Sequence, residues 1–199
     1  LTIALFLMHP LIVKRSLSMF SCRNTGDKHP YLRSDHSVEC WVGEHHSWAF
    51  GFALPCLIIW GLGIPGFWLW RIVMNRSQLH KLESKIRYGF LFTGYKEASS
   101  FWEISIVYRK VALAALVVFS AQWNIQVQAL IGVGFILISL YVHEVQQPFE
   151  RKQFNKLESL SLAVVACTLY GGLLYISESL STSSKVVVFV VLLLFNFAF

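Results

Sequence analysis

The chain has 199 residues, of which 55% are hydrophobic and 14% are charged, and its formal net charge is +6. Soluble domains carry about 25% charged residues, so this composition excludes an ordinary soluble domain and indicates an integral membrane protein. The positive charge then belongs to the loops, and we expect a lipid bilayer as partner and no nucleic acid. Leu1 and Phe199 lie in apolar runs, so residues 1–199 are expected to form a single membrane domain of a larger chain.

Six apolar segments predict an all-α, polytopic membrane bundle, because about 20 apolar residues suffice to cross a bilayer. The first and last segments are shorter than a full span, and we interpret them as truncated helices. The expected helices are residues 1–13, 47–73, 100–121, 125–142, 157–176 and 186–199.

The first polar connection, residues 16–45, contains Cys22 and Cys40, whereas Cys56 and Cys167 fall within predicted helices. We therefore expect a Cys22–Cys40 disulfide in an extracellular loop, because disulfides persist outside the cell. A zinc site built from the acidic, cysteine and histidine residues of this loop is the alternative. Its adjacent histidines cannot easily both point inward, so we expect no metal.

The second predicted helix contains Pro55 and Pro65, which lie among four glycines in an uncharged stretch. Proline removes a backbone donor and kinks a helix, so a kink is expected at each position. Carbonyl groups freed in hydrocarbon need partners, so this helix is expected to be buried among neighbouring helices. His9, beside Pro10, is expected to be a packed polar residue near the outer surface.

The second connection, residues 75–99, is amphipathic and basic, which predicts a helix lying on the membrane surface. An ordinary solvated connector helix is the alternative. Basic residues are more numerous in this connector and in residues 147–156 than in the loops that alternate with them. The positive-inside rule therefore places both segments in the cytoplasm and residues 16–45 outside.

Four ionisable residues lie in or at the ends of predicted spans, where such residues are rare and mark function by default: Glu103, Arg109, Lys110 and Glu158. Glu103 and Lys110 are seven residues apart on one helix face, so an intramembrane ion pair is one interpretation. A capping role for Glu103 at the helix start is the other. We expect Lys110 to face the bundle interior, with Glu103, Glu158 or a carbonyl freed by Pro65 as its partner, and Arg109 to reach the headgroups.

The fifth predicted helix carries Ala163, Cys167 and Gly171 at four-residue spacing. Small residues at this spacing let helices approach closely, so we expect a packing role. No phosphate-binding loop, metalloprotease helix or Ser/His/Asp order is present in the sequence. We therefore expect no enzyme, no catalytic residue and no cofactor.

A series of short motifs runs along nearly the whole chain: HP (9–10), MFSC (19–22), YLRSD (31–35), ECWVGEHHSWA (39–49), LPCLIIWGLGIP (54–65), YGFLFTGYK (88–96), FWEISIVYRK (101–110) and QPFERKQFNKLESLSL (147–162). This order resembles the membrane region of large protist surface proteins of the transient receptor potential-like or polycystin-like type. In those proteins a long cysteine-rich ectodomain precedes a helical bundle. The resemblance implies a channel-like or sensory membrane protein in the plasma or ciliary membrane.

Two functions are therefore expected from the sequence. The first is the channel-like or sensory domain, and the alternative is a non-conducting anchor for a large extracellular or ciliary-surface assembly. Residues 177–185 count against a pore of the familiar kind, because this connection is too short for a re-entrant segment between the last two helices. The expected partners are the rest of the chain's own ectodomain and either further copies of the chain or an extracellular filament.

Overall fold

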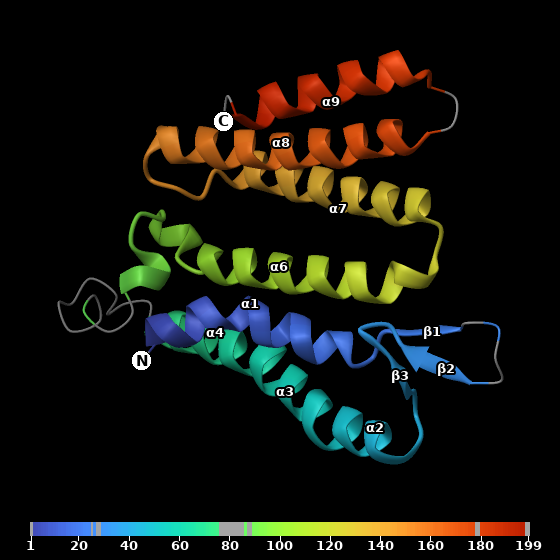
Figure 1. Ribbon diagram of the computed structural model, residues 1–199. Coiled ribbons are helices and arrows are strands. Elements are labelled where there is room, and N and C mark those ends of the chain that lie inside the picture. The colour runs from blue at the N-terminus through green and yellow to red at the C-terminus, as the bar shows by residue number, and fades with distance from the viewer. Residues whose placement is uncertain are drawn as a thin grey trace. The chain divides into compact units, whose positions relative to one another are not determined.

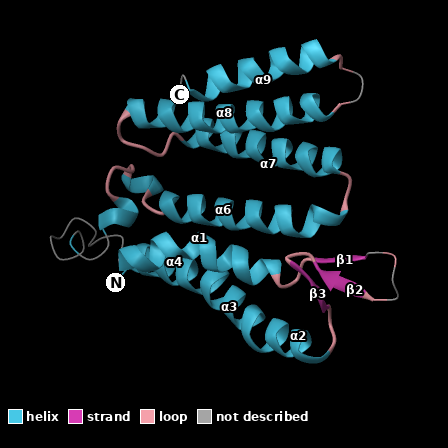
Figure 2. Ribbon diagram, viewed as in Figure 1, coloured by secondary structure: helices cyan, strands magenta, loops and turns pink. Residues whose placement is uncertain are grey.

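The structure is a computed structural model that describes residues 2–24, 26, 29–75, 86, 89–177 and 180–197 (Figure 1). Side chains are described from Met8 onward. Most of the described chain is helical, in agreement with the predicted class (Figure 2). The predicted connector helix at 75–99 falls largely on residues outside the described part, so its position on the membrane stays a prediction.

The described chain consists mainly of helices joined by short connections, with three consecutive strands after the first helix. The first helical elements are α1 (Thr2–Ser18), α2 (Gly43–Trp48), η1 (Ala49–Ala53), α3 (Leu54–Cys56), η2 (Leu57–Gly63) and α4 (Ile64–Met74). The later ones are η4 (Glu97–Ser99), α6 (Trp102–Phe119), η5 (Ser120–Gln122), α7 (Ile125–Gln146), α8 (Lys152–Ile176) and α9 (Thr182–Phe197). Three strands lie between α1 and α2: β1 (Cys22–Asn24), β2 (Pro30–Leu32) and β3 (Asp35–Glu39).

Two compact units divide the chain, and each is described by itself. The first contains residues 1–93 and 101–122, and the second contains residues 94–100 and 123–199. Residues 94–100 thus belong to the second unit although the chain on both sides of them belongs to the first.

Four helical stretches among the described residues are long and apolar enough to cross a membrane: Gly43–Met74, Glu97–Gln122, Ile125–Gln146 and Lys152–Ile176. They correspond to the second to fifth helices predicted from the sequence. The sixth, α9, is apolar but shorter. Four of the six predicted spans are therefore supported by length and composition.

The first helix is longer than predicted, because α1 continues through Lys14 and Arg15 to Ser18. The prediction ended this helix at Val13, where the first charges appear. Positive side chains near a helix C-terminus interact favourably with the negative end of its dipole, so they do not end the helix.

A small sheet, which the sequence did not predict, lies in the polar loop of residues 16–45. β1 and β2 pair antiparallel with Cys22 opposite Leu32, and β2 pairs antiparallel with β3. On β3, the hydroxyl and backbone N–H of Ser37 both donate to the Asp35 carboxylate, and these bonds lower the pKa of Asp35. Strands this short leave too little alternation in the sequence to be recognised.

The core of the first unit forms between α4, the start of α6 and the helical turn at residues 89–92. Trp68, Ile72, Leu91, Phe92 and Ile104 are buried there and contact one another. This cluster fixes one end of the unit, opposite to the end that carries the sheet (Figure 1).

In the second unit, α8 contacts both α7 and α9. A Cβ added at Gly171 on α8 would lie 2.7 Å from both Cδ atoms of Leu192 on α9, so only glycine allows this approach without a shift. One turn earlier on α8, Thr168 accepts a 3.0 Å hydrogen bond from the Asn196 side chain of α9. A close contact and a polar contact therefore join these two helices.

We predict that Gly171→Ala is less stable than Gly172→Ala by about 1 kcal/mol, the lower end of the usual cost of overpacking, because the added Cβ meets the Leu192 side chain while both variants gain the same helix propensity. The measurement is thermal unfolding of the purified chain in detergent micelles. Gly172→Ala is the matched control, because a Cβ at that position meets no atom within 4 Å. Equal stability of the two variants would show that α8 and α9 are not packed at Gly171.

Candidate functional site

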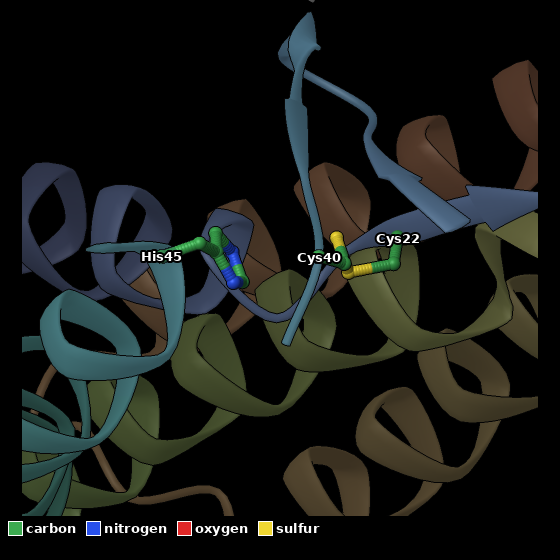
Figure 3. Close-up of side chains that lie close together, drawn as sticks. All are labelled: Cys22, Cys40 and His45. Atoms are coloured by element: carbon green, nitrogen blue, oxygen red, sulfur yellow. A yellow bond between two sulfur atoms is a disulfide. The ribbon is translucent and has the colours of Figure 1, made fainter. Parts of the chain in front are cut away.

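The predicted disulfide is confirmed. Cys22 on β1 and Cys40, the residue after β3, are bonded, with their Cα atoms 6.4 Å apart (Figure 3). The bond joins the first strand of the sheet to the chain that leads into α2. It therefore closes the loop that residues 16–45 were predicted to form.

The closed loop packs on the C-terminal end of α6. The Arg33 guanidinium donates to the Ala121 carbonyl oxygen at 2.5 Å, and the Ser21 hydroxyl donates to the Val118 carbonyl oxygen at 3.4 Å. Carbonyls at a helix C-terminus have no intrahelical donor, so side chains of the loop serve as partners. The loop and residues 120–122 consequently lie at the same end of the first unit, as alternating membrane crossings require.

His45 holds the other side of this loop. Its ring is 4% exposed, its Nδ1 accepts from the Trp41 backbone N–H at 3.0 Å, and its Nε2 lies 3.1 Å from the Met19 carbonyl oxygen. Because an N–H donates to Nδ1, the ring proton is on Nε2 and donates to Met19. One histidine thus ties the end of α1 to the turn before α2, where Trp41 has a φ of 69°.

Cys22, Cys40 and His45 form the one described group with the composition of a metal site, and their ligating atoms lie within 4.8 Å of one another (Figure 3). A metal would need thiolates and a free ring nitrogen. Both sulfurs belong to the disulfide, and both ring nitrogens of His45 are hydrogen-bonded. In this structure the three side chains therefore cross-link the loop, through the disulfide and the two hydrogen bonds of His45.

A cavity of about 270 Å³ lies between the loop and the end of α6. Its walls combine aromatic rings with polar side chains, among them Phe20, Trp41, Phe119, Ser21, Asn24 and Gln122. The cavity is smaller than most small-molecule sites and carries no charged side chain in its lining, so it does not by itself define a ligand.

The broken second helix has π-helical segments before both prolines. In η2 the N–H of Ile64 donates to the Ile59 carbonyl, five residues back. In the same register, the N–H of residue 65 would donate to the Trp60 carbonyl. Residue 65 is proline, which has no N–H. The structure thus changes helix register at the prolines, and a kink at Pro55 or Pro65 stays a prediction.

His9 supplies the missing donor. Its Nε2 lies 2.6 Å from the Trp60 carbonyl oxygen, and the side chain is 2% exposed. A neighbouring helix therefore serves the carbonyl freed at Pro65, but only 22% of the apolar window of Gly43–Met74 is buried, so the predicted burial of this helix among neighbours is not confirmed. The expected position of His9 near the outer surface is wrong, because α1 extends to Ser18 and His9 lies opposite the middle of the Gly43–Met74 span.

Tyr108 makes a second contact to the same helix. Its hydroxyl donates to the Leu62 carbonyl oxygen at 3.2 Å, next to Gly66, where a Cβ would lie 3.5 Å from that hydroxyl. Two side chains from two different helices, α1 and α6, therefore hydrogen-bond to carbonyls of η2.

The burial of the two basic residues of α6 reverses the prediction: Lys110 is exposed and Arg109 is half-buried. Tyr108 faces η2, and Lys110 lies about 200° further round the helix at about 100° per residue. The Pro65-linked carbonyl is taken by His9, and no described residue forms a hydrogen bond or ion pair with Lys110. The predicted interior partner of Lys110 is therefore absent from the described structure.

Glu103 and Glu158 are both half-buried, and both have interactions within the structure. The N-cap residue of α6 is Phe101, whose side chain makes no capping hydrogen bond, and the capping role of Glu103 stays a prediction. Among the predicted packing residues, Gly171 is buried, Ala163 is half-buried and Cys167 is exposed.

Residues 94–100 are held by the turn between α7 and α8. Tyr95 pairs with Phe149 in an isolated antiparallel bridge, and their rings stack with centroids 4.7 Å apart. The backbone N–H of Lys96 donates to the Pro148 carbonyl oxygen at 2.8 Å. These contacts place the end of the connector and the α7–α8 turn together, as expected for two segments on one side of a membrane.

The buried Asn155 side chain hydrogen-bonds to the backbone of the α7–α8 turn. Its side chain accepts from the Phe149 N–H at 3.0 Å and donates to the Phe149 carbonyl at 2.9 Å. Its own carbonyl oxygen lies 3.2 Å from Nε2 of His143, a residue with no exposed surface. Sequence reasoning missed His45, His143 and Asn155, because their partners are backbone atoms that no spacing rule identifies.

The chain is similar to Cysteine repeat modular protein A of Toxoplasma gondii, with 29% identity over 180 residues. The match covers 83% of this chain but 6% of that protein, so the chain spans only a small part of its relative's length. No family model and no solved structure matches the chain. The similarity supports a relationship to a protist cysteine-repeat protein and does not address the transient receptor potential-like or polycystin-like type.

We predict that His9→Leu destabilises the chain by about 1–2 kcal/mol, because the Trp60 carbonyl then lacks a donor inside the helical core. Thermal unfolding in detergent micelles measures the change. His9→Gln, which keeps a donor, should lose less stability. If the leucine variant were as stable as the parent chain, the His9–Trp60 bond would not be needed to hold the broken helix.

Proposed function

We propose that this chain is a polytopic membrane domain that anchors a larger, cysteine-repeat protein at a cell surface. In this proposal residues 16–45 lie outside the cell, and residues 75–99 and 147–156 lie in the cytoplasm. The proposal makes no use of catalysis, a cofactor or a metal.

The observation that carries the proposal is the disulfide-closed sheet on the end of α6. A disulfide between strands that pack against a helix end belongs to a compact extracellular cap rather than to a cytoplasmic loop. The four apolar spans supply the membrane part. The relative's name describes a modular cysteine-repeat protein, and the match to 6% of its length is consistent with one membrane region in a much longer chain.

The channel-like, transient receptor potential-like or polycystin-like function remains the competing proposal. The described structure offers no feature that favours it over the anchor, and the cavity between the loop and the end of α6 carries no charged side chain in its lining. Which membrane is used, plasma or ciliary, and whether the chain works as a homo-oligomer or with an extracellular filament, are further parts of the anchor proposal.

Reconstitution in liposomes separates the two functions. For the anchor we expect the chain to stay with membranes at alkaline pH and ion flux to equal that of empty liposomes. Flux that rises with protein content, and that a helix-packing variant such as Gly171→Val abolishes, would replace the anchor with a channel.

Orientation is tested by N-glycosylation in cells that secrete through the endoplasmic reticulum. Asp35→Asn creates the sequence Asn-His-Ser on the exposed strand β3, and we expect it to gain a sugar that an endoglycosidase removes. The natural sequon at Asn75 should stay bare, because we place it in the cytoplasm. Asp35→Asn combined with Ser37→Ala is the control that removes the new sequon. A sugar on Asn75 in place of one on the loop would invert the orientation.

A further inference from the structure

Lys110 lies at the middle of a membrane-length helix and is exposed. The apolar span Glu97–Gln122 has 26 residues, and Lys110 is thirteen residues from its first residue and twelve from its last. A lysine at this depth can bring its amine only part of the way to either interface. Its charge is therefore costly unless a group of opposite charge or water lies beside it.

The described spans contain no carboxylate at the same depth. The acidic residues that they carry lie within about two turns of a span end: Glu44, Glu97, Glu103, Glu144 and Glu158. The depth of each follows from its place in its own helix. A second copy of the chain would present the same residues at the same depths, so it would not supply a carboxylate opposite Lys110 either.

His9 of α1 and Tyr108 of α6 do not supply a negative charge to Lys110. His9 lies near Lys110, but a histidine adds no negative charge, and its Nε2 donates to the Trp60 carbonyl oxygen. The hydroxyl of Tyr108 donates to the Leu62 carbonyl oxygen on the far side of α6. Both groups are therefore engaged with the broken helix.

We propose that Lys110 is the docking point for a membrane helix of another protein that carries one aspartate or glutamate at mid-membrane. Such a helix would place a carboxylate beside Lys110 at the depth where the described spans have none. This interaction goes beyond the anchoring role, because it gives the domain a partner inside the bilayer.

The test uses the purified chain in phosphatidylcholine vesicles and four synthetic leucine- and alanine-rich membrane helices. One helix carries a single central aspartate, the second asparagine and the third leucine at that position, and the fourth has the aspartate two turns nearer its end. Energy transfer between labelled peptide and labelled chain reports association. We expect the central aspartate to bind about tenfold more tightly than the central leucine, with the displaced aspartate close to leucine.

Variants assign that preference to Lys110. Lys110→Met should abolish it, Lys110→Arg should keep it, and Lys96→Met, which changes an exposed lysine outside the apolar core, should leave it unchanged. The comparison of the four peptides on the unaltered chain tests the proposal even if Lys110→Met fails to fold. Equal binding of all four peptides, or a preference that survives in folded Lys110→Met, would overturn it.

Two further outcomes would also overturn the proposal. In a Cys56→Ser, Cys167→Ser background, reaction of Lys110→Cys with a membrane-impermeant thiol reagent would show that water, not a helix, surrounds this position. Self-association of the chain that depends on Lys110 would show that a second copy is the partner. We expect no labelling and unchanged self-association.

Discussion

The backbone carbonyl of Trp60 lacks a donor in the π register of its own helix, because the residue five positions later is Pro65. In hydrocarbon this deficit must be met by another chain segment. Nε2 of His9 donates to this carbonyl at 2.6 Å, and the bond fixes the position of α1 along the broken helix. Tyr108 then adds α6 to the same stretch through Leu62. Two hydrogen bonds thus join α1 and α6 to the η2 segment of the broken helix.

The same use of side chains recurs at three other places in the described chain. His45 bonds Met19, Arg33 bonds Ala121 and Asn155 bonds Phe149, and in each case a polar side chain serves a backbone atom at a helix end or loop. Apolar helix faces alone do little to select one packing arrangement in a bilayer, because lipid tails are as apolar as the side chains. Directional bonds at the ends of helices supply the specificity that the apolar faces lack.

The sequence predicted the properties that depend on local composition. Span length, the two prolines and the pairing of Cys22 with Cys40 follow from runs of apolar residues and from which cysteines lie in loops. The role of His9 could not be predicted, because its partner carbonyl is 51 residues away in the chain. The three short strands, the π-helical segments and the role of Asn155 could not be predicted either, because each depends on particular backbone hydrogen bonds that residue patterns do not specify. Lys110 illustrates the limit: helix periodicity placed it on one face with Glu103, but only the structure shows that Glu103 is half-buried while Lys110 is exposed.

Residues 94–100 have a consequence for how the protein is made. They leave the ribosome before α6, yet Tyr95 and Lys96 find their partners only in the turn that follows α7. Synthesis is vectorial and proceeds at about 5–20 residues per second, so this segment has to wait a few seconds for Phe149 and Pro148 to emerge. The first unit can close while Tyr95 and Lys96 still lack their partners. The α7–α8 hairpin, which is inserted later, then supplies these partners.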